Sequence, residues 1–154
     1  MTLAYLPWQR PASYDDRPCV RDDQQELTYQ QFADRVEAAA EQFAGLGIGP
    51  GDVVAVMLPN RIELLVAVVA AWRLGAVATP INPAFTAHEA GYQIEDAGAV
   101  LVVGNDASTP SAGRPLLLAD DLRREPAGEV GEASTSPEDL ALLIYTSGST
   151  GAPK

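Results

Sequence analysis

The stretch DVVAVMLPNRIELLVAVVAAWRLGAVATPINPAFTAHEAGYQIEDAGAVLVV, residues 52–103, decides the fold of this chain. It contains three apolar runs of strand length, at residues 52–58, 76–79 and 99–103, separated by two stretches with helical character. Alternation of strand and helix over so short a stretch predicts two right-handed crossovers and a parallel sheet. The expected fold class is therefore α/β, with a parallel βαβαβ core.

Local signals predict where the helices begin. Thr28-Tyr-Gln-Gln31 and Thr86-Ala-His-Glu89 have the capping-box pattern, in which hydroxyl and carboxylate or amide side chains satisfy free N–H groups. Between them, Asn60 with Glu63 is expected to cap an apolar helix that runs to Arg73.

The first helix is predicted to bury one face, because its apolar residues recur at intervals of three or four. These residues are Phe32, Val36, Ala39, Phe43 and Leu46. Glycines follow each helix and offer the left-handed conformation that ends one. They are Gly45 and Gly47, then Gly75, then Gly98.

The remaining segments divide the chain around this 27–103 core. Residues 1–26 are polar and proline-containing, which predicts an irregular arm. Residues 104–137 are rich in Gly, Pro, Ser and acid and read as a variable connection, with one edge strand at Leu116–Leu118. Residues 138–154 are expected to form a strand, Leu140 to Tyr145, and a loop after it.

The loop sequence Thr146-Ser-Gly-Ser-Thr-Gly-Ala-Pro-Lys154 has the composition of a phosphate-holding loop. Its glycines let successive backbone N–H groups converge on one anion, and Lys154, the only lysine in the chain, adds a positive charge. A Walker loop is excluded, since Ala152-Pro153 separates Gly151 from the lysine and no Ser or Thr follows. A flexible Ser/Gly/Thr tail remains the alternative.

Four stretches, taken in order, resemble the adenylate-forming (AMP-binding) superfamily, which includes acyl-CoA synthetases, luciferases and peptide-synthetase adenylation domains. They are Leu27-Thr-Tyr-Gln-Gln-Phe, residues 46–60, residues 74–83, and Asp139 to Lys154, DLALLIYTSGSTGAPK. The resemblance covers most of the chain outside residues 105–137. It implies the first part of that family's large N-terminal domain.

The resemblance also implies a reaction. The carboxylate of a small-molecule acid attacks the α-phosphate of ATP, giving an acyl-adenylate and pyrophosphate. A thiol, usually that of coenzyme A, then takes the acyl group and AMP leaves. Mg²⁺ accompanies the ATP phosphates, and fatty acid metabolism is the implied setting. The ATP phosphate-binding residues carried over from the motif are Thr146, Ser147, Gly148, Ser149, Thr150, Gly151 and Lys154.

The family's later elements have no counterpart in this sequence. Absent are the aromatic-Gly-x-Thr-Glu segment, the ribose-binding aspartate, the hinge and the C-terminal domain with its catalytic lysine. No catalytic or metal-binding residue is therefore assigned, and the chain is expected to be an incomplete, inactive N-terminal fragment. Residues 81–89 favour the acyl-CoA synthetase branch over the peptide-synthetase branch. A non-catalytic interaction fragment, which binds a partner or self-associates through uncovered apolar surface, is a second alternative, and a stand-alone nucleotide-binding module is a third.

Composition narrows the partners. The formal net charge of −11 argues against nucleic-acid binding, which needs a basic face. The longest apolar run, Leu64 to Trp72, is too short to cross a bilayer. Cys19, the single cysteine, cannot form an internal disulfide, which fits a reducing cytoplasm, and is expected to be an inert or partly buried thiol.

Other conspicuous residues are given structural roles. His88 lies near a helix start without a nucleophile or metal-ligand cluster, so a capping or solvated role is favoured over catalysis. The pairs Asp15-Asp16 and Asp22-Asp23 are interpreted as solvated charge, and Arg123-Arg124 as too short for a binding patch. Trp72, like Trp8, is expected to pack.

Overall fold

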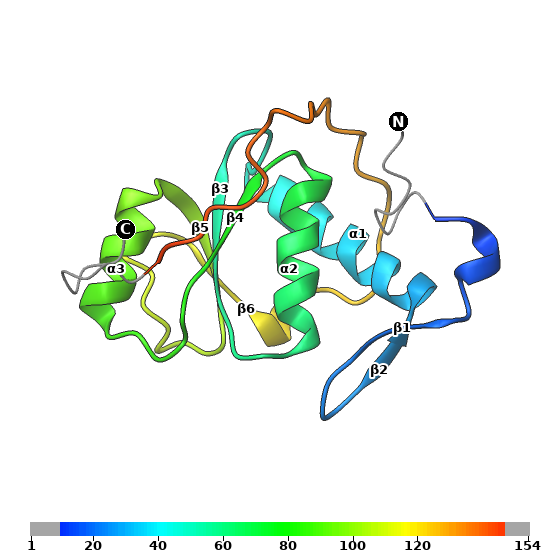
Figure 1. Cartoon of the computed structure of the whole chain (residues 1–154), viewed down its shortest axis with the longest axis horizontal. Helices are drawn as coiled ribbons and strands as arrows, with labels where there is room; N and C mark the ends of the chain where they lie inside the picture. The colour runs from blue at the N-terminus through cyan, green and yellow to red at the C-terminus, as the bar shows by residue number, and fades with distance from the viewer. Residues whose placement is uncertain (1–9, 147–154) are drawn as a thin grey trace.

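A computed structural model describes residues 10–146, and Figure 1 shows a central sheet with helices on both sides of it. The strands are β3 (Val53–Met57), β4 (Val77–Pro80), β5 (Ala99–Gly104) and β6 (Leu116–Leu118). Their order is β4-β3-β5-β6, and every neighbouring pair is parallel. The predicted α/β class and parallel core are confirmed, and the edge strand at 116–118 is β6.

Two apolar layers cover the sheet. Helices α1 (Tyr29–Gly45) and α2 (Ile62–Arg73) pack on one face, and α3 (Ala87–Asp96) packs on the other. Strand β3 serves both layers, since Val54 and Val56 join the first cluster while Ala55 and Met57 join the second. A strand buried on both faces must be continuously apolar, which is why residues 53–57 do not alternate.

The capping boxes of α1 and α3 are present as predicted. The Thr28 and Thr86 hydroxyls each accept a hydrogen bond from the backbone N–H three residues later, at 3.3 Å in both cases. The reciprocal bonds from Gln31 and Glu89 close both boxes. Gly47, Gly75 and Gly98 have φ of +87°, +71° and +64°, as expected for residues that end helices.

Two details of helix α1 were predicted wrongly. Gly45 is the last helical residue, and it is not among the glycines with positive φ. Leu46, expected on the buried face, is about half exposed, because the helix has ended and its side chain no longer follows the helical period. The other four residues of that face are buried.

The arm expected to be irregular instead carries structure. A short 3₁₀ helix, η2 (Ala12–Tyr14), is followed by strands β1 (Pro18–Arg21) and β2 (Glu26–Thr28), which pair antiparallel. The strands were missed because they are three and four residues long and polar. Leu27 of β2 is buried in the core that α1 and α2 form, and this contact fixes the β1–β2 hairpin to the rest of the fold.

The hairpin also corrects the prediction for the start of α2. The N-cap position is Arg61, and its side chain makes no capping hydrogen bond. Instead Oδ2 of Asp22, from the β1–β2 turn, accepts the N–H of Ile62 at 2.9 Å. The proposed Asn60–Glu63 cap is therefore wrong, because a carboxylate from forty residues away in sequence takes that role.

The connection that follows β5 includes β6 and a short 3₁₀ helix, η3 (Ala119–Asp121). Farther on it is tied to the two helices of the first layer. Glu41 of α1 accepts the N–H groups of Ala127 and Gly128, at 2.9 and 2.7 Å. Arg73 of α2 donates to the carbonyl of Val130 at 2.7 Å. No helix within residues 10–146 is long and apolar enough to cross a membrane.

Candidate functional site

The segment leading to the predicted phosphate loop lies beside β4. It forms a single parallel bridge, Ala78 to Leu142, so the regular strand expected over residues 140–145 was wrong. Leu140, Leu142 and Ile144 are exposed, and no second layer covers them among the described residues. After the bridge the chain crosses toward α3, as Figure 1 shows.

Side chains from three elements hold this segment. Trp72 of α2 donates its indole N–H to the carbonyl of Ala141 at 2.7 Å. Thr79 of β4 donates its hydroxyl to the carbonyl of Leu143 at 2.8 Å. Tyr145 donates its hydroxyl to Oδ2 of Asp96, the last residue of α3, at 2.6 Å. The segment is therefore fixed without a full strand ladder.

Of the predicted phosphate-binding residues, the structure describes Thr146, which is exposed. The remainder lie outside the described residues. They are Ser147, Gly148, Ser149, Thr150, Gly151 and Lys154. Their role in binding phosphate therefore stays a prediction.

A second feature was not predicted. A hollow of about 330 Å³ lies where the chain leaves β3 and β5, lined by Pro59, Asn60 and Arg61 on one side and by Asn105 on the other. The chain leaves β3 through α2 to reach β4 on one side, and it returns from β4 through α3, on the opposite face of the sheet, to reach β5 on the other side. The strand order therefore reverses between β3 and β5, and their carboxyl ends form a topological switch point. Ligands of open α/β sheets bind in such crevices.

Arg61 organises this hollow. Its guanidinium donates to Glu63 at 2.7 Å, to Asn105 at 3.2 Å and to Asp120 at 2.7 Å. Glu63 is 6% exposed and also accepts from Gln25 at 3.0 Å. Burial alone would raise the pKa of Glu63, but these hydrogen bonds, with that from Arg61 foremost, lower it on balance. Both sides of the pair therefore remain charged at neutral pH.

Asp22 lies at the rim of the same hollow. Its carboxylate accepts the backbone N–H groups of Ile62, Gln24 and Gln25, each at 2.9 Å. These bonds, led by the one from Ile62, lower its pKa to about 2. The interpretation of Asp22 as solvated charge was thus wrong. Sequence alone offered one signal for this role, an Asp in a polar turn, and nothing that indicated its distant partner.

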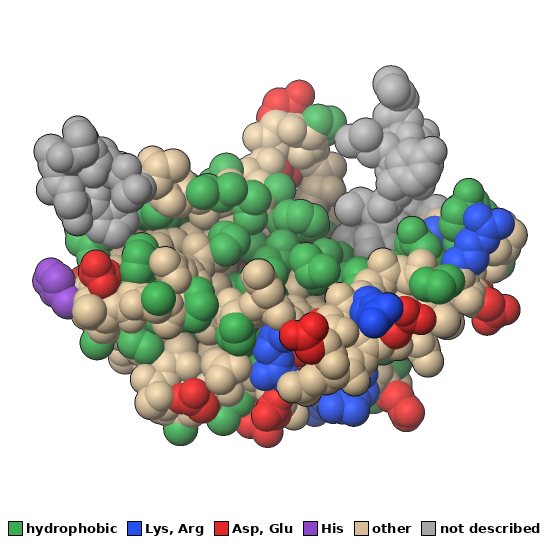
Figure 2. Space-filling model, turned by 60° about the horizontal axis from the view of Figure 1, so that its bottom comes forward, with side chains coloured by type: hydrophobic (Ala, Val, Ile, Leu, Met, Phe, Trp, Pro, Cys, Tyr) green, Lys and Arg blue, Asp and Glu red, His purple; other side chains and the backbone are tan. Residues whose placement is uncertain are grey.

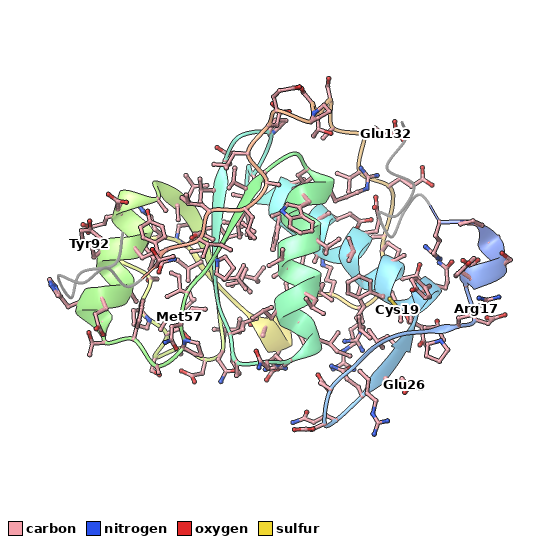
Figure 3. The ribbon with its side chains drawn as sticks, viewed as in Figure 1. Arg17, Cys19, Glu26, Met57, Tyr92 and Glu132 are labelled. Carbon is pink, nitrogen blue, oxygen red and sulfur yellow. The ribbon has the colours of Figure 1, made fainter. Side chains whose placement is uncertain are left out.

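The other singled-out residues have structural surroundings. Asp15 pairs with Arg10 at 2.8 Å, a correction to its assignment as solvated charge, whereas Asp23 is exposed. His88 is exposed in the first turn of α3, beside Glu89. Cys19 lies half-buried on β1 near α1 (Figure 3), and burial raises the pKa of its thiol. A protonated thiol is a poor nucleophile, in keeping with the inert role expected for it.

Within residues 10–146, no three His, Cys, Asp or Glu side chains are placed so that they could share a metal ion.

Comparison with known proteins identifies the class. The AMP-binding enzyme family matches residues 8–154, and the chain therefore belongs to this family of adenylate-forming enzymes. The α/β fold agrees with that of O-succinylbenzoate coenzyme A synthetase from Bacillus subtilis, solved in complex with AMP, with a TM-score of 0.85 and 30% identity. The match covers 98% of this chain and 41% of that one.

Relatives come from two branches of the family. The chain is 33% identical to 4-coumarate–CoA ligase 3 of Oryza sativa subsp. japonica, over 100% of this chain and 31% of the relative. It is 32% identical to bacitracin synthase 2 of Bacillus licheniformis, over 99% of this chain and 6% of the relative. The chain thus spans less than a third of the length of these two relatives.

Proposed function

We propose that this chain supplies the first part of an ATP-dependent carboxylate–CoA ligase, in which residues 146–154 hold the phosphates of ATP. The observation that carries the proposal is the sequence from Asp139 to Lys154, found in a chain that belongs to the AMP-binding enzyme family. The bonds that fix residues 141–145 support it, because a phosphate loop needs a fixed base.

The chemistry of this loop follows from charge. When the carboxylate attacks the α-phosphate, the departing pyrophosphate gains negative charge that must be stabilised. Thr146, Ser147, Ser149 and Thr150 would donate hydroxyl hydrogens, and Gly148 and Gly151 would donate backbone N–H groups. Lys154 would place its ammonium against the same phosphates. Mg²⁺ bound to the phosphates would supply the largest opposing charge.

Coenzyme A is the proposed acyl acceptor. Residues 81–89, INPAFTAHE, favour the acyl-CoA synthetase branch over the peptide-synthetase branch. Relatives named as CoA ligases that match over nearly the whole chain also support it, among them a 2-succinylbenzoate–CoA ligase from Geobacillus and a feruloyl-CoA synthase from Amycolatopsis. An adenylation domain of the peptide-synthetase type is the competing proposal, since those relatives are equally similar.

A chimeric enzyme tests the proposal. Residues 1–154 replace the matching part of 4-coumarate–CoA ligase 3, and the product is assayed with ATP, a panel of aromatic and fatty acids, and coenzyme A. We expect CoA ester formation that is lost in the Lys154→Ala chimera. A folded chimera that forms adenylate but no CoA ester favours the peptide-synthetase branch. A folded chimera without adenylate formation contradicts the proposal.

The exposed apolar surface favours a second candidate function, a non-catalytic interaction piece that self-associates. Leu140, Leu142 and Ile144 alternate along a segment bridged to the sheet edge, and Leu65 of α2 is also exposed. Apolar side chains gather on the centre of one face in Figure 2. Sedimentation of the isolated chain tests this candidate, which predicts association that Ile144→Ser reduces. A monomer at high concentration contradicts it.

A further inference from the structure

Residues 123–146 cross the outside of the fold as one long strap, drawn orange to red in Figure 1. Within this strap the structure has a single β-bridge and no helix or regular strand. None of its side chains is buried, and only Val130, which is half-buried, packs against the core that α1 and α2 form. Leu122, immediately before the strap, is 7% exposed and belongs to that core. Apolar burial therefore contributes little to holding the strap in place.

Helix α1 holds the first half of the strap by its backbone. The two carboxylate oxygens of Glu41 accept the N–H groups of Ala127 and Gly128, at 2.9 and 2.7 Å. Glu37, four residues earlier on the same helix, accepts the N–H of Val130 at 2.7 Å. Because these bonds are made to peptide groups, they fix the path of the strap while most of its side chains stay in solvent.

The second half of the strap is held in a similar manner. Within residues 10–146, its backbone pairs with the sheet only at Ala78, whose N–H donates to Ala141 at 3.0 Å and whose carbonyl accepts from Leu143 at 2.9 Å. Side chains make the other hydrogen bonds between this half and the rest of the described fold. Segments with few buried apolar contacts and exposed hydrogen bonds open at a lower free energy than a packed core.

A hydrogen-bonded turn joins the two halves. The N–H of Ser136 donates to Oδ2 of Asp139 at 2.7 Å, and the N–H of Asp139 donates to the carbonyl of Ser136 at 3.0 Å. Since the turn is held by its own bonds, it keeps its shape when the contacts to the helices and the sheet are lost. Movement of one half is therefore passed to the other.

We propose that residues 123–146 form a releasable strap, which detaches from α1, α2 and β4 as one unit while the α/β core stays folded. The strapped form is the ground state, and the released form is a minor population in exchange with it. Release uncovers the outer edge of β4, where the N–H and the carbonyl of Ala78 can then pair with another extended strand. This inference does not rest on the proposed function, since it involves no residue beyond Thr146.

Native-state hydrogen exchange in low urea, followed by nuclear magnetic resonance on the intact 154-residue chain, provides the test. The amides of Ala127 and Leu143 report on the two halves of the strap, and the amide of Val102, buried on β5, reports on global unfolding. Glu41→Gln weakens the hold on the first half alone. Glu26→Gln is the matched control, because it makes the same chemical change at an exposed position of β2.

We expect the amides of Ala127 and Leu143 to exchange at least about a hundredfold faster than that of Val102, with a smaller dependence on urea. Glu41→Gln should raise the exchange rate of the Leu143 amide by about tenfold and leave that of Val102 as it is in Glu26→Gln. Tyr145→Phe removes the bond to Asp96 at the opposite end, and it should speed the exchange of the Ala127 amide.

A Leu143 amide that exchanges at the same rate in Glu41→Gln and Glu26→Gln overturns the proposal, since the two halves then open separately. Strap amides that exchange at the rate of Val102 also overturn it, because the strap then opens only when the whole chain unfolds. The same conclusion follows if Glu41→Gln and Tyr145→Phe accelerate Val102 as much as they accelerate the strap.

Discussion

Replacing Glu63 by glutamine perturbs the most enclosed charge described in the structure. The carboxylate accepts from Arg61 at 2.7 Å and lies 3.5 Å from Arg35. Losing one partner of a fully buried ion pair costs about 3–5 kcal/mol. Because the Arg61 side chain is 26% exposed, solvent screens part of this loss. We expect Glu63→Gln to lower the free energy of unfolding by about 2–3 kcal/mol, close to one or two charge-assisted hydrogen bonds.

The cost of Glu63→Gln should depend on pH in a defined direction. The pKa of Glu63 in the folded chain lies below its ordinary value of 4.5. A depressed pKa contributes stability that is fully present above the unfolded pKa and is lost as pH falls through the folded one. The difference in the free energy of unfolding between the original chain and Glu63→Gln should therefore be constant near neutral pH. It should shrink below about pH 4.5.

Urea unfolding at a series of pH values measures this difference, with circular dichroism as the signal. Glu95→Gln is the control, because it makes the same chemical change at an exposed position of α3. It should alter the unfolding free energy by less than about 0.5 kcal/mol. A Glu63→Gln variant as stable as Glu95→Gln at pH 7, or one whose deficit grows on acidification, refutes the reasoning.

Four further substitutions test the turns, the core and the start of α2. Gly75→Ala should destabilise the chain by about 1–2 kcal/mol in urea unfolding, since φ is +71° and the added carbon would lie 3.2 Å from Thr135. Gly91→Ala, at a position on α3 where the added carbon meets open space, should instead stabilise the chain by about 0.5–1 kcal/mol. Phe43→Ala should cost about 3–5 kcal/mol by the same assay, because this side chain is fully buried; a loss below about 1 kcal/mol argues against the core described. Asp22→Asn should lower the melting temperature at pH 7, and the deficit should vanish toward pH 2, where the folded pKa of Asp22 lies; an equal deficit at both pH values contradicts its role at the start of α2.

The alternating core could be predicted from sequence because its signals are local. The run Val53–Met57 is apolar and is soon followed by Pro59-Asn60. Each capping box, the one that begins at Thr28 and the one that begins at Thr86, spans only four residues. Each of these features is decided by neighbours along the chain.

The features that sequence missed depend on distant partners. The start of α2 is capped by Asp22 through a hairpin whose strands are too short to show a period. The strand expected at residues 140–145 has the right composition, but a regular strand needs a ladder of backbone partners, and Ala78 is the one bridged partner in the described range. The bond from Tyr145 to Asp96 likewise joins residues whose proximity no local pattern indicates.

ATP–pyrophosphate exchange tests the central claim most directly, because it reports adenylate formation without requiring coenzyme A. The isolated chain should show no exchange with any acid, since positioning of the carboxylate and α-phosphate, worth about 7–11 kcal/mol, would come from groups beyond this sequence. The chimera with 4-coumarate–CoA ligase 3 should exchange, and Lys154→Ala should abolish that exchange. Exchange by the isolated chain that disappears in Lys154→Ala, or a chimera indifferent to Lys154→Ala, contradicts the account.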